Sequence, residues 1–318
     1  MTNRWWSVND MGDLSGRIAL VTGANSGIGY ETARALADHG AHVVMACRNQ
    51  EKAGQAAAKL SDDLNDPSLE ILSLDLSDQV SVHRAAEQFR ADHDRLDLLI
   101  NNAGVMGTPY RQTGDGFELQ MATNHLGHFA LTGLLLDRIT STAGSRVVTV
   151  SSQLHRRGHI PFDDVAGNTI RNTWLNYGNS KLANLLFTAE LSRRLGGSDQ
   201  GALPSTLALA SHPGWTRSNL AGTGAAVGHG KARAVVGRAV GHTFGQSAAG
   251  GALPSLYAAT SPDVVSGQFI GPRYLFQLFG PPKVVQPNRR AKNKDDAARL
   301  WEISEELTEV RYPIAAAR

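Results

Sequence analysis

A short glycine-rich segment near the N-terminus constrains the fold of this chain more than any other feature. An apolar run ends at Thr22, the sequence GANSGIG follows, and a helix-like pattern begins at Ile28. Glycines between a strand and a helix let the backbone approach a pyrophosphate, and the helix offers its unpaired N–H groups and positive dipole end to the phosphates. The segment predicts a dinucleotide cradle made by Gly23, Asn25, Ser26, Gly27, Ile28 and Gly29. Its spacing, G-x-x-x-G-x-G, varies from G-x-G-x-x-G, and a tight turn without a ligand is the alternative interpretation.

Short apolar runs alternate with helix-like segments through most of the chain. Runs rich in Val, Ile and Leu predict strands at 17–22, 42–47, 69–76, 96–100, 146–151, 206–211 and 268–270. Helix-like patterns predict helices at 28–39, 51–64, 77–93 and 177–195. Strands that are apolar on both faces are typical of parallel sheets covered by helices. We therefore predict an α/β fold, a Rossmann-type doubly wound parallel sheet of about seven strands with helices on both faces.

The domain organisation follows from the absence of a linker, a repeat or a low-complexity segment. Residues 1–318 are predicted to form a single domain. A glycine-rich stretch follows the sixth strand, and we interpret 215–245 as a candidate substrate lid, with a surface insertion as the alternative. Two consecutive prolines, Pro281 and Pro282, predict a turn. Residues 292–311 are predicted to be a C-terminal helical extension, with a helix at 295–310.

Composition excludes several classes of protein. The net charge is +2, which indicates neither a nucleic-acid surface nor an acidic partner. The sole cysteine, Cys47, cannot form a disulfide within the chain or a multi-cysteine zinc site. We find neither a secretory signal pattern nor an apolar run approaching the ~20 residues that span a bilayer, so a cytoplasmic location is expected.

The end of the second predicted strand indicates which dinucleotide is bound. An NAD site usually carries an acidic residue here for the ribose 2′-hydroxyl. This chain instead has Arg48, followed by Asn49. A guanidinium suits a 2′-phosphate because it can form two parallel hydrogen bonds. We predict that NADP(H) is preferred over NAD(H), and a surface arginine is the alternative.

Two further segments fit a cofactor groove at the ends of neighbouring strands. Asp75 and Leu76 end the third strand, where a carboxylate could accept from the adenine amino group. Asn102, Ala103 and Gly104 follow the fourth, where small residues let the backbone lie against the adenosine ribose. Taken singly, each segment could equally be an ordinary turn.

A tyrosine and a lysine four residues apart supply a candidate proton-transfer pair. Tyr177 and Lys181 would lie on one face of a helix, one turn apart. A free phenol has a pKa of about 10 and is a poor acid–base catalyst at neutral pH. A nearby ammonium would lower that pKa by favouring the phenolate. The pair could therefore exchange a proton with a substrate oxygen.

These motifs together resemble the short-chain dehydrogenase/reductase superfamily. The order of segments matches over about 15–275: 22–29 (TGANSGIG), 101–104 (NNAG), Asn124, 151–152 (SS), 177–181 (YGNSK) and 213–214 (PG). Within it, the chain resembles the retinol-dehydrogenase-like branch, whose bacterial members are commonly soluble, through 46–49 (ACRN), 124–129 (NHLGHF), 151–156 (SSQLHR) and 180–184 (SKLAN). The resemblance implies an NADP(H)-dependent oxidoreductase that interconverts a carbonyl compound and an alcohol by hydride transfer.

The resemblance also implies residue roles. Tyr177 would be the general acid or base, and Lys181 would lower its pKa and hold the nicotinamide ribose. Ser152 would bind the substrate oxygen, with Ser151 as its adjacent alternative, and Asn124 would hold a water that links Lys181 to solvent. The loop that binds the nicotinamide and diphosphate would contain Pro213, Gly214, Thr216 and Ser218. Ser218 departs from the usual threonine but keeps the hydroxyl.

The segment between Ser152 and Tyr177 should border the substrate pocket. It carries His155 and His159, whose spacing could mimic a metal pair, but a third ligand is not evident and we predict no catalytic metal. Apolar and aromatic residues here and in the lid suggest a lipophilic carbonyl or alcohol substrate. A homodimer or homotetramer through the helix beginning at Tyr177 is implied unless the C-terminal segment covers it.

Two other classes of function compete with this interpretation. A non-catalytic NADP(H)-binding sensor or scaffold should have lost Tyr177, Lys181 or Ser152, and all three are present. An epimerase or dehydratase of nucleotide sugars is disfavoured because that class has a different glycine spacing and a larger C-terminal substrate region.

Overall fold

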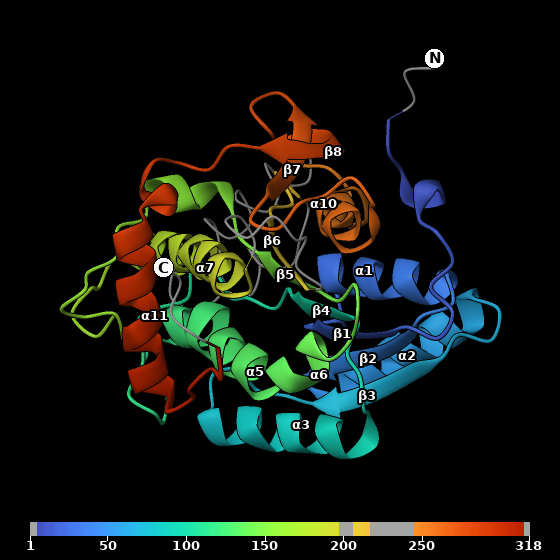
Figure 1. Cartoon of the computed structure of the whole chain (residues 1–318), viewed down its shortest axis with the longest axis horizontal. Coiled ribbons are helices and arrows are strands. Elements are labelled where there is room, and N and C mark those ends of the chain that lie inside the picture. The colour runs from blue at the N-terminus through green and yellow to red at the C-terminus, as the bar shows by residue number, and fades with distance from the viewer. Residues whose placement is uncertain (1–4, 197–205, 217–244, 315–318) are drawn as a thin grey trace, which may run out of the picture.

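A single twisted sheet forms the centre of the molecule (Figure 1). The computed structural model describes residues 5–196, 206–216 and 245–314. In this part of the chain the sheet has eight strands in the order β3-β2-β1-β4-β5-β6-β7-β8. The strands are β1 Ile18–Thr22, β2 His42–Cys47, β3 Leu69–Ser73, β4 Leu98–Asn101, β5 Arg146–Val150, β6 Leu207–Ser211, β7 Phe269–Tyr274 and β8 Phe279–Val285. All neighbours pair in parallel except β7 and β8, which are antiparallel.

Helices connect the strands. They are α1 Gly27–Asp38, α2 Gln50–Asp63, α3 Gln79–Asp92, α4 Leu119–Met121, α5 Gly127–Leu134, α6 Leu136–Thr140, α7 Thr173–Arg194, α10 Ala248–Thr260 and α11 Lys294–Thr308. Shorter turns are the 3-10 helices η1 Val8–Asp10, η3 Gln153–Arg157 and η4 Arg290–Lys292 and the π-helix η2 Ala122–Leu126. Side-chain oxygens accept from backbone N–H groups in the first turns of the five longer helices that carry such a cap, which fixes where these helices begin: Asn49 for α2, Asp78 for α3, Asn172 for α7, Ser247 for α10 and Asn293 for α11. Glu118 caps the short α4 and Ser152 caps η3 in the same way.

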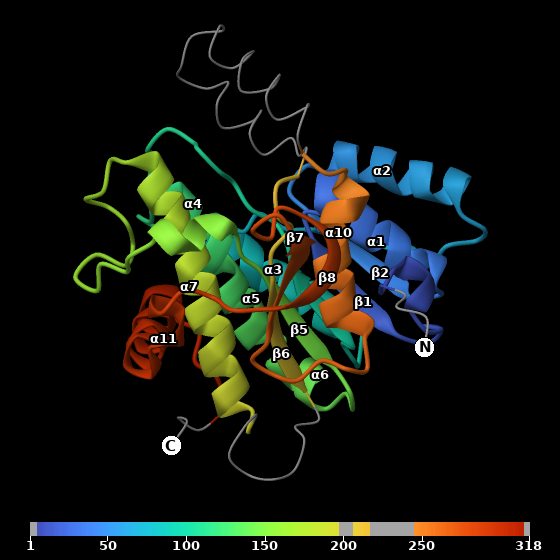
Figure 2. The same cartoon turned by 90° about the horizontal axis from the view of Figure 1, so that it is seen from above.

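Helices cover both faces of the sheet. Successive strand residues point to opposite sides, so one strand can pack against both helical layers. In β1, Ala19 and Val21 pack with α1, α2 and α10, whereas Leu20 packs with α3, α5 and α6 on the other face. The two helical layers are visible on either side of the sheet in Figures 1 and 2, and α11 lies beside α7 in both views. The doubly wound α/β prediction is confirmed.

The eighth strand differs from the sequence-based expectation. Pro281 and Pro282 were predicted to make a turn, but both lie inside β8, so that prediction is wrong. Proline cannot donate to a sheet ladder and is therefore tolerated mainly at an edge. Among the described strands, β8 is the outermost and has β7 as its one neighbour.

Other elements match the predictions with shifted boundaries. Helix α7 begins at Thr173, so Tyr177 lies in its second turn instead of at its start. Helix α11 falls within the predicted extension at 292–311. Most of the candidate lid, including Ser218, lies outside the described residues. Among the described helices, the structure contains none with the length and apolarity needed to cross a membrane.

Candidate functional site

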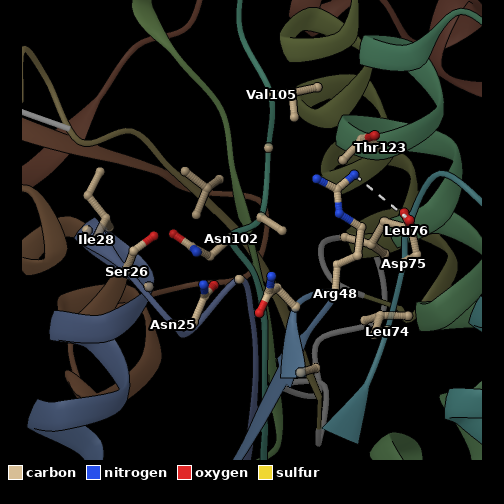
Figure 3. Close-up of a pocket in the computed structure, with 18 of the residues that line it drawn as sticks. Asn25, Ser26, Ile28, Arg48, Leu74, Asp75, Leu76, Asn102, Val105 and Thr123 are labelled. Atoms are coloured by element: carbon tan, nitrogen blue, oxygen red, sulfur yellow. Dashed lines mark ion pairs between the residues drawn. The ribbon is translucent and has the colours of Figure 1, made fainter. Parts of the chain in front are cut away.

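A cleft of about 420 Å³ lies where the parallel strands end. Ligands of open α/β sheets bind in the crevice outside the carboxyl ends of the strands. The lining residues follow β1 to β6: Gly23, Asn25, Ser26, Gly27, Ile28, Gly29, Ala46, Arg48, Asn49, Lys52, Leu74, Asp75, Leu76, Asn102, Ala103, Gly104, Val105, Thr123, Val150, Ser151, Tyr177, Lys181 and Pro213. Figure 3 shows the glycine turn with Asn25 and Ser26 on one side of this cleft and Arg48 with Asp75 on the other.

In the glycine turn, the backbone at Gly29 lies so close to Gly23 and Asn102 that a side chain would not fit. A Cβ on Gly29 would lie 2.3 Å from the carbonyl oxygen of Gly23 and 2.5 Å from the side-chain nitrogen of Asn102. Gly27 has a φ of +57°, in the left-handed region that favours glycine. The start of α1 can therefore approach a ligand with its backbone N–H groups, as a phosphate cradle requires.

A buried polar network that the sequence did not reveal ties this turn to the next strand. The Thr22 hydroxyl accepts hydrogen bonds from the backbone N–H groups of Asn102 and Ala103, both at 2.9 Å. It also contacts Nε2 of His128 at 2.8 Å, while Nδ1 of His128 lies 3.1 Å from the Asn124 carbonyl. Burial lowers the pKa of His128 to about 3. The imidazole is therefore neutral, which lets one nitrogen donate and the other accept.

The far end of the cleft carries positive charge. The Arg48 side chain is 68% exposed, and its guanidinium lies 3.9 Å from the Asp75 carboxylate (Figure 3). The other Asp75 oxygen accepts from the N–H and hydroxyl of Ser77, at 2.9 and 2.6 Å. Asn49 caps α2, and Lys52 in the first turn of that helix also lines the cleft. This end has the donors that a ribose phosphate needs.

The phenol of Tyr177 lines the opposite part of the cleft and is 6% exposed. Burial raises its pKa to about 12, and a hydrogen bond with the Ser152 side chain acts in the opposite direction. The sequence-based expectation was that Lys181 lowers the pKa of Tyr177. In the structure burial raises this pKa and outweighs the contact with Ser152. The Lys181 ammonium lies 5.8 Å from the centroid of the Tyr177 ring. At neutral pH the phenol is protonated, as a proton donor must be.

The last residue of β5, Val150, fixes the Lys181 side chain through a hydrogen bond. Its ammonium donates to the Val150 carbonyl at 3.0 Å, and the Asn184 amide donates to the same oxygen at 3.1 Å. Burial lowers the pKa of Lys181 to about 8. A Cβ on Gly104 would lie 3.4 Å from this ammonium, in ordinary contact, and 3.1 Å from Oδ1 of Asn124, which is a tight contact.

Asn124 sits in the π-helix η2, an irregularity frequent at functional sites. Its side chain accepts from the Val105 N–H at 2.8 Å and donates to the Val105 carbonyl at 3.0 Å and the Ser180 hydroxyl at 2.9 Å. These bonds clamp the segment after β4 against α7. Asn124 lies behind the cleft wall and is fully buried.

Of the loop after β6, the structure describes the part up to Thr216, and one of the three residues predicted there lines the cleft. Pro213 lines the cleft, whereas Gly214 and Thr216 do not. Thr216 instead packs against α10, where a Cβ on Gly251 would come within 2.2 Å of its methyl group. The role predicted for Ser218 concerns a position outside the described residues.

Several lining residues were missed because nothing in the sequence marks them. Val105, Thr123 and Leu74 are ordinary apolar or small residues whose place depends on the path of the chain. Lys52 carried a usable signal, because it is a cation four residues after Arg48, in the first turn of the helix that follows.

Of the two histidines of the 153–176 segment, His155 is engaged in contacts outside the cleft. Nδ1 of His155 lies 2.6 Å from the Ser152 carbonyl, and its Nε2 accepts from the backbone N–H of Asn288 at 3.2 Å. Burial lowers its pKa to about 4. Both ring nitrogens therefore serve the local structure.

The fold and the cleft place the chain in the doubly wound α/β class of nucleotide-binding proteins. The family model described as short chain dehydrogenase matches residues 17–199. The chain belongs to this family: it is an oxidoreductase of the fold that binds a nicotinamide cofactor and acts on small molecules.

Relatives support the same assignment. Human retinol dehydrogenase 12 is 41% identical over 301 residues, covering 94% of this chain and 88% of its own. Human retinol dehydrogenase 14 is 38% identical over 311 residues, covering 93% and 87%. An uncharacterized protein from Mycobacterium paratuberculosis has a crystal structure with a TM-score of 0.79 and 42% identity, covering 98% of this chain and all of its own. A short chain dehydrogenase from Shigella flexneri 2a, complexed with NADP, has a TM-score of 0.62 at 24% identity over 82% of this chain and 98% of its own, which shows the shared fold.

Proposed function

We propose that this chain is an NADP(H)-dependent oxidoreductase that interconverts a carbonyl compound and an alcohol, with Tyr177 as the acid or base. The observation that carries the proposal is the Tyr177 phenol, hydrogen-bonded to Ser152, in the wall of a cleft whose far end presents Arg48. When bound, the nicotinamide cofactor supplies or accepts the hydride.

The protein's own groups manage the proton. Tyr177 is protonated at neutral pH and would give its proton to the carbonyl oxygen during reduction. Ser152 would donate a hydrogen bond to the same oxygen and stabilise the charge that develops there. Lys181 would keep positive charge next to the phenol, and Asn124 would fix the wall of the cleft through its bonds to Val105 and, as the family resemblance suggests, hold a water.

The cofactor would lie along the whole cleft. Its pyrophosphate fits the start of α1, where Gly29 leaves no room for a side chain. The proposed contacts are Gly23, Asn25, Ser26, Gly27, Ile28 and Gly29 for the phosphates, Asp75 and Leu76 for the adenine, and Asn102, Ala103 and Gly104 for the ribose. Pro213, Gly214, Thr216 and Ser218 are proposed for the nicotinamide side.

Preference for NADP(H) rests on Arg48 and Lys52, two cations at the adenosine end of the cleft. Replacing Arg48 as Arg48→Ala should raise KM for NADPH about 10- to 100-fold, the loss of a charge-assisted hydrogen bond, with little change in KM for NADH. Steady-state kinetics with both cofactors measure this. Arg84→Ala, on the exposed surface of α3, is the control, and a wild-type preference for NADH would refute the proposal.

The catalytic role of Tyr177 is tested by Tyr177→Phe. Removing the proton donor should lower kcat by about 10²-fold or more, while NADPH still binds with near wild-type affinity. NADPH oxidation with a panel of aldehydes, ketones and quinones gives the rate, and fluorescence titration gives the binding. Tyr257→Phe, on α10 outside the cleft lining, should keep full activity. More than a tenth of wild-type turnover in Tyr177→Phe would contradict the role, and NADPH binding by the wild type without turnover of any compound would favour a sensor.

The substrate class proposed is a lipophilic carbonyl compound or alcohol. Trp174, one helical turn before Tyr177, and Trp215, two residues after Pro213, are 52% and 53% exposed. The Trp174 ring also approaches Gly107, two residues beyond Val105 in the cleft wall. Apolar surface beside the proton donor suits a substrate such as the retinol that names the human relatives. The same panel tests this, because polar short-chain aldehydes should then show the higher KM.

A further inference from the structure

Three side chains with metal-binding atoms converge at the end of the sheet far from the cleft. His42 is the first residue of β2, Glu70 is the second of β3, and His93 follows the last turn of α3. One ligand atom of each lies within 4.8 Å of the other two. The cleft is at the opposite ends of these strands, where its nearest lining residues, Ala46 and Leu74, come four residues later, roughly 13 Å away at 3.3 Å per residue.

The fold itself brings these residues to one face. Val44 pairs with Glu70 between β2 and β3, and His42 lies two residues before Val44, so all three side chains share a face. That face packs against α3 (Figure 1). His93 is the C-cap residue of this helix. The His93 ring rests against Phe89 with centroids 4.7 Å apart, and its side chain is 11% exposed.

The distances suit a tetrahedral metal ion. Nε2 of His42 lies 3.3 Å from Oε2 of Glu70, and Nε2 of His93 lies 2.9 Å from the same oxygen. Two ligands that are each about 2.1 Å from a tetrahedral zinc ion lie about 3.4 Å apart. A shift of a few tenths of an ångström in the His93 ring would bring its nitrogen into this range.

A further contact orients His42 as a metal ligand requires. Its Nδ1 lies 2.7 Å from the Ser68 hydroxyl. A hydroxyl can accept a hydrogen bond as well as donate one. Ser68 can therefore accept a hydrogen bond from a protonated Nδ1 of His42, which leaves the lone pair of Nε2 directed at Glu70. Metal-binding histidines generally have such a partner on the second nitrogen, because it fixes the ring orientation and tautomer.

We propose that His42, Glu70 and His93 bind a divalent zinc ion that links β2 and β3 to the end of α3. Imidazole and carboxylate are both good ligands for this ion, and three protein ligands leave a fourth position for water. The three residues belong to elements that are distant in sequence, so the bound ion stabilises the folded chain. This site is separate from the cleft and takes no part in hydride transfer.

The test is zinc binding by the intact, tag-free chain after treatment with EDTA and dialysis. Calorimetric titration with Zn²⁺ alone should show one tight site per chain. His42→Gln and His93→Gln should each weaken binding by about 100-fold, and Ser68→Ala by about tenfold. At a free Zn²⁺ concentration 100 times Kd, the wild-type Tm should rise by roughly 4 °C.

Matched variants separate this site from adventitious binding. His83→Gln removes a histidine from the same helix but outside the triad, and it should bind Zn²⁺ like the wild type. Glu70→Gln keeps the size of the side chain and should lose most of the affinity, so it decides the matter if a histidine variant fails to fold. Visible absorption of Co²⁺ in the wild type should report tetrahedral coordination. Absence of a one-to-one site, or equal affinity in the wild type and the triad variants, overturns the proposal.

Discussion

At the scale of single residues, two adjacent serines after β5 have opposite environments. Side chains alternate along extended chain, so Ser151 and Ser152 point to different sides. The Ser151 hydroxyl is buried and donates to the Lys181 carbonyl at 2.7 Å. The Ser152 hydroxyl instead accepts from the Leu154 N–H at 3.2 Å and bonds with the Tyr177 phenol. The contact with Tyr177 supports the proposal that Ser152 meets a substrate oxygen, whereas Ser151 is the serine of the two that lines the cleft.

The two serines should therefore give different mutant phenotypes. Ser152→Ala should lower kcat about 10²-fold because it removes a donor to developing charge. Ser151→Ala should keep kcat near wild type but reduce the free energy of unfolding by about 1 kcal/mol, because the buried Lys181 carbonyl loses one hydrogen bond. Turnover measurements and denaturant unfolding separate the two effects. The assignment would be reversed if Ser151→Ala lost turnover and Ser152→Ala kept it.

The sequence predicted the residues of this site that belong to contiguous motifs. Gly29, Arg48, Tyr177 and Lys181 each stand at a position where strand or helix geometry forces them towards the cleft. The link from Thr22 to His128 could not be predicted, because it joins residues from β1 and α5 through side-chain contacts that only the packed fold creates.

At the scale of secondary-structure elements, α11 covers the outer face of α7. Trp301 is 1% exposed and packs against Phe129, Phe187 and Tyr312, with ring centroids 5.2, 5.8 and 4.4 Å away. The Arg194 guanidinium lies 4.4 Å from the centroid of the same ring. One tryptophan therefore joins α5, α7 and the C-terminal segment.

Trp301→Ala should remove this junction. Loss of a large buried aromatic ring should reduce the free energy of unfolding by about 3–5 kcal/mol. Guanidinium unfolding followed by circular dichroism measures the change, with Glu306→Ala on the exposed side of α11 as the control, expected within about 0.5 kcal/mol of wild type. A loss below 1 kcal/mol for Trp301→Ala would show that α11 is not an integral part of the fold.

The sequence predicted those helices and strands whose residues follow a clear apolar or helical pattern. β2 has the predicted bounds because a continuous apolar run, Val43 to Cys47, follows a turn and His42. The helix α10 was missed because Ala248–Thr260 is apolar on all sides, contains Pro254 and lacks helical periodicity. The strand β8 was missed because its prolines imitate a turn, and only its place at the sheet edge permits them.

At the scale of the whole molecule, four buried histidines make folding sensitive to acid. Burial lowers the pKa of His125 and His155 to about 4 and that of His128 and His212 to about 3. In the unfolded chain a histidine titrates near 6.5. Below that pH the unfolded chain binds protons that the folded chain excludes, so stability falls as the pH falls from about 6.5 towards 4.

The expected loss is large enough to measure. At pH 5.5 each of the four histidines should lower the free energy of unfolding by about 1.4 kcal/mol relative to pH 7.5, and together they should lower it by about 5.5 kcal/mol. Guanidinium unfolding at both pH values measures the difference. His128→Gln should reduce this difference by about 1.4 kcal/mol, whatever it does to absolute stability, whereas His83→Gln on α3 should leave it unchanged. A wild-type difference below 1 kcal/mol would mean that these imidazoles gain protons inside the folded protein, and the neutral network that joins His128 to Thr22 would then have to be redrawn.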